Sequence, residues 1–231
     1  MRLRGAIFDA DGTLLDSLSV WDTLGGDYLR SIGYAPREGL DEALRDLSLS
    51  QAARYYQDAY GVTLRTEKIL EGVNALLERF YRFEAPLRPG AAALLAALRE
   101  RGVRLCVATA TDRRLIEAAL ERCGVRPYFD GVFTCEEVGH GNDGPQIYEA
   151  ARRFLGTERE ETLVFEDALY AVRTAKEAGF PVAAVHDCHE TKQEEVRRLA
   201  DVYLENLTEL DRLEKYLSGA SSGGPGAPLS V

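Results

Sequence analysis

The chain has little basic charge and no closely spaced cysteine pair. Its 28 Lys and Arg residues are outnumbered by 38 Asp and Glu, the formal net charge is −10, and no basic cluster stands out along the sequence. A general nucleic-acid-binding surface needs such a cluster, so we expect no nucleic-acid partner. The four cysteines show no C-x-x-C spacing, which favours reduced thiols over a disulfide framework.

Long hydrophobic runs are absent as well. No apolar segment approaches the roughly 18 residues that a membrane-spanning helix needs. The N-terminal sequence MRLRGAIFDAD also lacks the hydrophobic region of a signal peptide. We therefore expect a cytoplasmic protein, a monomer without a membrane partner, that acts on a small soluble molecule.

What the sequence does contain is a short apolar strand that ends in two acids. Residues 6–8 (AIF) are typical of a strand buried on both faces, and Asp9, Asp11 and Gly12 follow at once. Side chains at positions i and i+2 leave the same side of an extended chain, so the two carboxylates lie close together. Crowded carboxylates repel unless a proton or a metal ion separates them, which predicts an Mg²⁺ site, an acid/base pair, or both. The alternative is a turn whose Asp side chains only cap backbone N–H groups.

Two regions with different periodicity follow this strand. Residues 17–84 show helical spacing, with helices predicted to begin at caps Ser50 and Thr66, and their aromatic residues are expected to form a small core. From residue 85 onward, strands and helices alternate, which is typical of a parallel sheet with right-handed crossovers.

The 231 residues, 45% of them hydrophobic, suffice for one α/β core and a smaller insertion. We predict an α/β fold in which residues 1–16 and 85–217 form a Rossmann-like core with a parallel sheet. Residues 17–84 form an inserted all-helical domain, and residues 218–231, rich in Gly, Ser, Pro and Ala, form a disordered tail.

Other predicted strands also end in polar residues. The strand VRLCVATA ends near Thr109, and the strand TLVFED ends in Glu166 and Asp167. Ligands of open parallel sheets bind beyond the carboxyl ends of the strands, so these side chains should meet Asp9 and Asp11. Four carboxylates in a partly dry cleft need a cation, and hard oxygen ligands with few imidazoles favour Mg²⁺ over zinc.

The helix after Thr109 adds an anion site. Its first N–H groups, from Thr111 to Arg113, can hold an anion, and an anion site beside a metal site indicates phosphoryl chemistry. Taken singly, Thr109 could be an ordinary helix cap, and Glu166 and Asp167 could be a favourable match to a helix dipole.

As a set, the motifs FDADGTLLDS, VATAT and VFEDALYA resemble three of the four motifs of the haloacid dehalogenase (HAD) superfamily, in the branch with a helical cap. The resemblance covers residues 4 to 215 and implies a Mg²⁺-dependent phosphatase, a phosphomonoester hydrolase. It implies that Asp9 is the nucleophile that forms an aspartyl phosphate and that Asp11 is the acid/base, a residue that the family's dehalogenases do not use. It also implies phosphate binding by Thr109 and Ala110, and metal binding by Asp9, the backbone carbonyl of Asp11, Glu166 and Asp167.

The fourth motif departs from the family pattern. The family usually has G-K-x-x-P-[DE]-I-[FY], whereas residues 141–148 read GNDGPQIY, so Asn142 occupies the position of a phosphate-binding lysine. Asn can donate hydrogen bonds but cannot replace the charge. Three interpretations follow: an enzyme whose cation comes from His140, Arg113 or Arg114, a slow enzyme, or a non-catalytic phosphometabolite-binding protein. We favour retained activity because the other catalytic positions match.

The helical cap is expected to select the substrate, a small phosphorylated metabolite. Candidate contact residues are Trp21, Arg45 and Ser48. A β-phosphoglucomutase-like mutase is the alternative, although the arginine that grips a second phosphate in that group aligns with Leu49. The segment HDCHE at 186–190 contains metal-type ligands, but contiguous loop residues rarely surround one ion, so we expect it to be exposed to solvent instead.

Overall fold

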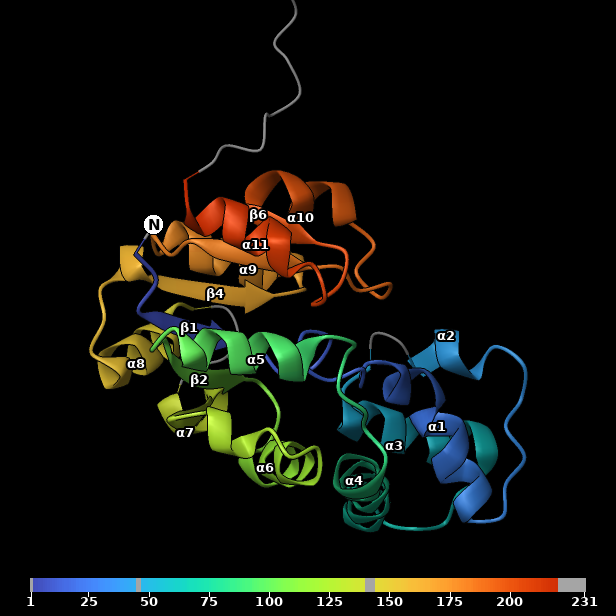
Figure 1. Cartoon of the computed structure of the whole chain (residues 1–231). Helices are drawn as coiled ribbons and strands as arrows, with labels where there is room; N and C mark the ends of the chain where they lie inside the picture. The colour runs from blue at the N-terminus through green and yellow to red at the C-terminus, as the bar shows by residue number, and fades with distance from the viewer. Residues whose placement is uncertain (1, 45–46, 140–143, 220–231) are drawn as a thin grey trace, which may run out of the picture. The chain divides into compact units, whose positions relative to one another are not determined.

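The computed structural model describes residues 2–44, 47–139 and 144–219 (Figure 1). The chain divides into two compact units, which are described separately. Residues 1–15 and 87–231 form the core unit, and residues 16–86 form the helical unit. The predicted role of the helical unit as a cap stays a prediction, and most of the predicted tail, residues 220–231, lies outside the described residues.

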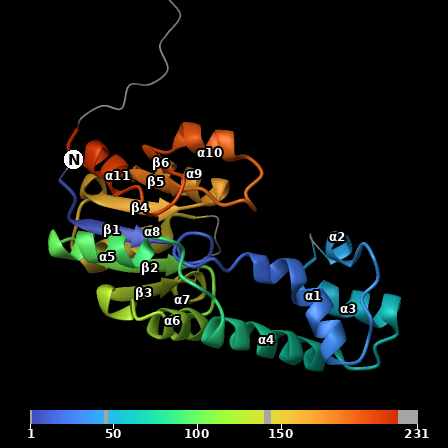
Figure 2. The same cartoon turned by 45° about the vertical axis from the view of Figure 1, so that its right-hand side comes forward.

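The core unit contains a parallel sheet of six strands in the order β3-β2-β1-β4-β5-β6 (Figure 2). The strands are short apolar runs, and β1, β4 and β5 are buried along their whole length, as expected for a sheet covered on both faces. The predicted α/β fold with a parallel sheet is therefore confirmed. The strands are β1 (Gly5–Phe8), β2 (Arg104–Thr109), β3 (Gly131–Thr134), β4 (Thr162–Glu166), β5 (Val182–Val185) and β6 (Val202–Leu204).

Helices connect the strands and supply the rest of the hydrophobic core. Buried residues of α8, α9 and α10 pack on one set of alternating strand residues, which includes Ile7, Cys106 and Val164. Helices α5 and α11 contact β2 and β6. The helices of the core unit are α5 (Ala91–Glu100), α6 (Arg113–Arg122), α7 (Cys135–Val138), α8 (Gln146–Leu155), α9 (Leu169–Glu177), α10 (Gln193–Leu199) and α11 (Leu210–Leu217), with short 3₁₀ turns η1 (Arg126–Tyr128) and η2 (Arg159–Glu161).

The strand order places the predicted site residues at one edge of the sheet. Strand β1 lies between β2 and β4, so the chain first builds outward through β2 to β3 and then returns to the other side of β1. Such a reversal leaves a crevice beyond the carboxyl ends of the central strands. Asp9 directly follows β1, Thr109 ends β2 and Glu166 ends β4.

The helical unit consists of α1 (Ser19–Ser31), α2 (Leu40–Leu44), α3 (Leu49–Tyr60) and α4 (Thr66–Phe83). Its core is partly aromatic, since Tyr28, Tyr56 and Tyr81 are buried. Helix α4 passes close to the Tyr28 ring, because a Cβ atom on Gly72 would lie 2.6 Å from that ring. The expectation that the whole aromatic stripe forms the core was wrong for Phe83, which is 66% exposed.

The helix starts predicted in this unit were also wrong. Ser48, not Ser50, caps α3, because Ser48 has an extended backbone and Gln51, three residues later, completes a reciprocal capping box. Helix α4 begins at Thr66 itself, and Arg65 precedes it without a side-chain cap. Among the residues that the structure describes, no helix is both long and apolar enough to span a membrane.

Candidate active site

Three acids converge where β1 and β4 end. Carboxylate oxygens of Asp9, Glu166 and Asp167 all lie within 4.8 Å of one another. The parallel register pairs Phe8 with Phe165, and the Asp9 amide donates to the Phe165 carbonyl at 2.9 Å, so the acids that follow each strand become neighbours. Glu166 and Asp167 are only 5% and 4% exposed. The structure therefore shows the predicted convergence of strand-end acids for these three residues.

The acids in this cluster oppose one another's ionisation. Desolvation, together with the charges of Glu166, Asp167 and Asp11, raises the pKa of Asp9 well above its usual range. Burial raises the pKa of Glu166 to about 7. Burial and the Glu166 charge raise the pKa of Asp167, although a hydrogen bond from Thr13 acts in the opposite direction. A divalent cation would relieve this repulsion.

The ligand chemistry of the cluster fits Mg²⁺. The converging atoms are carboxylate oxygens, the hard ligands that Mg²⁺ prefers. A cavity of about 30 Å³, which is room for a single water or ion, touches two of the three acids, Asp9 and Glu166, together with Thr109 and Ala110.

Two hydroxyl groups contact the acids at the end of β4, Glu166 and Asp167. The Thr13 hydroxyl donates to Asp167 Oδ1 at 3.0 Å, and the Tyr148 hydroxyl donates to Glu166 Oε1 at 2.9 Å. Burial and the Glu166 charge raise the pKa of Tyr148, which keeps the phenol a neutral donor. Sequence reasoning missed both roles. Tyr148 closes the fourth motif, and the apolar face of α8 signals its burial but not its partner.

Asp11 faces a different partner from Asp9. The Thr111 hydroxyl donates to Asp11 Oδ2 at 2.7 Å and so connects the turn after β1 to the end of β2. The turn itself requires Gly12, whose φ of +83° lies in the left-handed region. The side chain of Asp11 does not belong to the group of three converging acids, and its predicted metal contact through the backbone carbonyl stays a prediction.

The end of β2 provides the predicted phosphate-binding residues. Thr109 is only 3% exposed, and its hydroxyl accepts a hydrogen bond from the Thr111 amide at 3.2 Å. Asp112 caps α6 by accepting from the Arg114 amide at 2.8 Å. The amide of Thr111, predicted to take part in anion binding, is therefore already engaged in this structure.

Arg113 is not placed to replace the lysine of the fourth motif. Its Nε and Nη2 donate to the Glu137 carboxylate at 2.5 and 2.6 Å, and Nη2 also donates to the Val132 carbonyl. Arg114 is largely exposed beside Asp112. Asn142 and His140 lie outside the described residues.

The HDCHE segment forms a second cluster of ligand-type atoms. One such atom each of Asp187, Cys188 and His189 lies within 4.8 Å of the others. Asp187 already binds Arg88 through Oδ2, whereas its Oδ1 contacts the amide and ring of His189. The expected exposure was wrong for Asp187, which is 3% exposed, because the carboxylate turns inward to the guanidinium.

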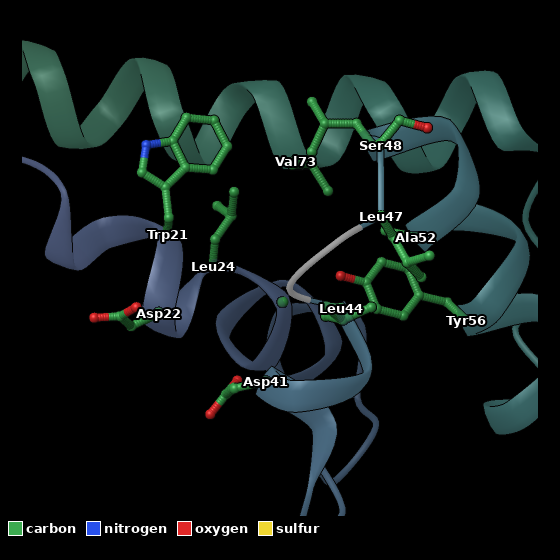
Figure 3. Close-up of a pocket in the computed structure, with 12 residues that line it drawn as sticks. Trp21, Asp22, Leu24, Asp41, Leu44, Leu47, Ser48, Ala52, Tyr56 and Val73 are labelled. Carbon is green, nitrogen blue, oxygen red and sulfur yellow. The ribbon is translucent and has the colours of Figure 1, made fainter. Parts of the chain in front are cut away.

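The helical unit contains a larger cavity of about 400 Å³ (Figure 3). Trp21 and Leu24 of α1, Tyr56 of α3 and Val73 of α4 surround it, and Trp21 remains 48% exposed. Ser48 also lines the cavity, although its hydroxyl is used in the α3 capping box. Two of the three predicted substrate-selecting residues thus share this cavity, whereas Arg45 lies outside the described residues.

Comparison with known proteins identifies the family. A family model of haloacid dehalogenase-like hydrolases matches residues 3–179. The chain belongs to this family. It is similar to hexitol phosphatase A of Escherichia coli, with 31% identity over 80% of this chain and 84% of the relative. The predicted family and the predicted enzyme class, a HAD-type phosphatase, are confirmed.

Solved structures of the family share the fold. A Thermotoga maritima protein provisionally assigned as a β-phosphoglucomutase aligns with a TM-score of 0.82 at 24% identity, over 92% of this chain and 99% of that one. CbbY of Rhodobacter sphaeroides, solved with phosphate, aligns with a TM-score of 0.70 at 27% identity, over 90% and 96%.

Proposed function

We propose that this phosphatase hydrolyses the phosphomonoester of a small phosphorylated sugar, with Mg²⁺, through an aspartyl-phosphate intermediate on Asp9. The observation that carries the proposal is the meeting of Asp9, Glu166 and Asp167 at the strand reversal. Similarity to a hexitol phosphatase supports the substrate class, and similarity to CbbY crystallised with phosphate supports a phosphate site.

Each residue in the proposed reaction has a distinct role. A carboxylate oxygen of Asp9 attacks phosphorus as the bond from phosphorus to the sugar oxygen breaks. Asp11 gives a proton to that departing oxygen. Asp11 then takes a proton from the water that attacks the aspartyl phosphate, which releases inorganic phosphate and restores Asp9. The contact from Thr111 orients Asp11 for both transfers.

The remaining residues hold the ion and the phosphate. Asp9, the Asp11 carbonyl and Asp167 would hold Mg²⁺, with Glu166 directly or through water. A bound Mg²⁺ offsets the repulsion between the Asp9 carboxylate and the phosphate dianion. Thr109 and Ala110, at the end of β2, would bind the transferred phosphoryl group beside Asp9.

A panel of phosphorylated compounds tests the proposal. We expect Mg²⁺-dependent release of inorganic phosphate from hexitol and sugar monophosphates, with p-nitrophenyl phosphate as a general substrate. Product analysis by ³¹P NMR separates hydrolysis, which gives free phosphate, from transfer to another sugar hydroxyl. If no compound of the panel released inorganic phosphate, the proposed hydrolysis would be refuted.

The mutase remains the second candidate, and Arg45, which lies outside the described residues, adjoins Leu44 of the cavity in the helical unit in the sequence. Leu49 lines this cavity, and none of its described lining residues is Lys or Arg. A mutase must hold a second phosphate, for which a basic side chain is the usual partner. The predicted monomeric state and cytoplasmic location stay predictions.

Asn142 gives a prediction of its own. We expect Asn142→Lys to raise kcat/KM by about 10- to 100-fold, because the variant would restore a cation where charge develops in the transition state. Steady-state kinetics on p-nitrophenyl phosphate measures the effect, and Asn142→Gln is the neutral control. An equal or lower kcat/KM in the lysine variant would show that a different group supplies the cation.

A further inference from the structure

Arg88, which lies outside the acid cluster, donates a hydrogen bond to the turn that follows Asp9 and Asp11. Arg88 precedes α5, and its side chain is only 15% exposed. Its Nη1 donates to the Gly12 carbonyl at 2.6 Å and to Asp187 Oδ2 at 2.5 Å, and its Nη2 donates to the His186 carbonyl. One guanidinium thus joins the turn after β1 to the segment after β5.

Both carboxylate oxygens of Asp187 have hydrogen-bond partners. Its Oδ1 accepts the amide of His189 at 2.8 Å and lies 2.8 Å from the ring Nδ1 of the same residue. Burial alone would raise the pKa of Asp187, but the contacts with His189 and Arg88 outweigh burial and lower it. The carboxylate is therefore ionised and fixes the orientation of the Arg88 guanidinium.

The same segment also supports the other half of the acid cluster. Glu190 Oε2 accepts the Leu169 amide at 2.9 Å, at the start of α9 and two residues after Asp167. In the turn after β1, Thr13 follows Gly12, whose carbonyl accepts from Arg88, and the Thr13 hydroxyl donates to Asp167. The segment 186–190 therefore contacts, directly or through Arg88, both loops that supply the converging acids.

We propose that Arg88 and Asp187 are positioning residues, which fix the Gly12 carbonyl so that the turn presents Asp9 and Thr13 to Asp167 in the geometry of the metal site. The inference rests on the proposed function. An arginine suits this task because its planar fork can bind Gly12, His186 and Asp187 at once, whereas lysine has a single nitrogen. The test must separate this role from a purely stabilising one, because removal of one partner from a buried ion pair is itself strongly destabilising.

A second arginine–aspartate pair, at the other edge of the sheet and more exposed than Arg88–Asp187, provides the control. Asp130 precedes β3, and its Oδ2 pairs with Arg99 at 2.8 Å and accepts the Leu105 amide at 2.9 Å. Asp130→Asn removes the same kind of charge from an Arg pair and a backbone contact. This site lies at the strand starts, away from the acid cluster.

The test compares Asp187→Asn and Arg88→Lys with Asp130→Asn in the full chain. For the first two, we expect kcat on p-nitrophenyl phosphate to fall about 10- to 100-fold while KM changes less than about twofold. Their Mg²⁺ dissociation constants, measured by calorimetry, should rise by about 10-fold or more. Asp130→Asn should lower the Tm but leave kcat and Mg²⁺ affinity within about twofold.

A double variant tests whether Asp187 acts through Arg88. If it does, Arg88→Lys combined with Asp187→Asn should lose no more kcat than the worse single variant, whereas independent effects would multiply. Circular dichroism and Tm identify variants that fail to fold, and Arg88→Lys, which keeps the charge, is the milder of the two changes.

Two results would overturn the inference: unchanged Mg²⁺ affinity and kcat in Asp187→Asn and Arg88→Lys, or equal losses in Asp130→Asn. Failure of the proposed function is a separate result, in which the unaltered chain releases no phosphate. In that case, Mg²⁺ calorimetry alone decides the positioning role, because it needs no turnover.

Discussion

Asp9→Asn is expected to lower kcat by about ten-thousandfold or more, because the amide can neither attack phosphorus nor bind the ion as a charged ligand. The same change should raise the Tm of the metal-free protein above that of the unaltered chain at pH 8. The substitution removes one of three mutually repelling carboxylates, and burial together with the neighbouring acidic charges already raises the pKa of Asp9. Phosphate release and thermal unfolding in EDTA measure the two effects.

Opposite changes in activity and stability distinguish a functional residue from a structural one. Asp130→Asn, the control at the opposite edge of the sheet, should lower stability and keep activity. Full turnover in Asp9→Asn would contradict the covalent mechanism. A lower Tm would contradict the repulsion described for the metal-free cluster.

Removal of Mg²⁺ should have the second largest effect on turnover. We expect EDTA to lower turnover by about a thousandfold or more and added Mg²⁺ to restore it, because the ion stabilises charge in the transition state. EDTA-treated protein assayed with and without Mg²⁺ measures this effect. Equal rates in EDTA and in Mg²⁺ would refute the metal dependence.

The metal-free protein should also lose stability as the pH rises. Folding raises the pKa of Glu166 from 4.5 to about 7, so the folded state favours its protonated form. The resulting stabilisation is complete below about pH 4.5 and is lost as the pH rises through about 7, for a change of about 3 kcal/mol. Asp9 and Asp167, whose pKa values are also raised, act in the same direction.

Denaturant unfolding in EDTA between pH 5 and pH 8 measures this dependence. Because Mg²⁺ binds the ionised carboxylates, it should increase the free energy of unfolding more at pH 8 than at pH 5. A Glu166→Gln variant should show a flatter profile in EDTA. A free energy of unfolding in EDTA that rises between pH 5 and pH 8 would contradict the raised pKa values.

The sequence was sufficient for the central part of the fold and of the site. Asp9 stands at the end of an apolar run, so local sequence alone indicates that it lies at a strand end. Glu166 and Asp167 could be placed beside Asp9 because alternating strands and helices predict parallel strands whose carboxyl ends share one edge. The expected meeting of Asp11 with these acids was wrong for its side chain, which contacts Thr111 instead. The first argument needs only one segment, and the second needs the alternation of strands and helices along the chain.

The contacts that sequence reasoning missed join distant segments. Arg88 and Asp187 are separated by 99 residues, and Thr13 and Asp167 by 154, and neither pair has a spacing that signals contact. Such pairs depend on strand register and on the path of each loop, which hydrophobic periodicity does not specify. The predicted cap of α3, Ser50, was wrong for a local reason. Ser48 and Ser50 both precede good helix formers, and only the reciprocal contact between Ser48 and Gln51 distinguishes them.

The central place of β1 has a consequence for biosynthesis. Strand β1 leaves the ribosome first, but its two neighbours are residues 104–109 and 162–166. Helices of the 16–86 unit pack on one another, so they can form while later codons are still being translated. The nascent chain must therefore keep β1 unpaired until β2 has emerged, and it acquires its acid cluster only after residue 167 has emerged.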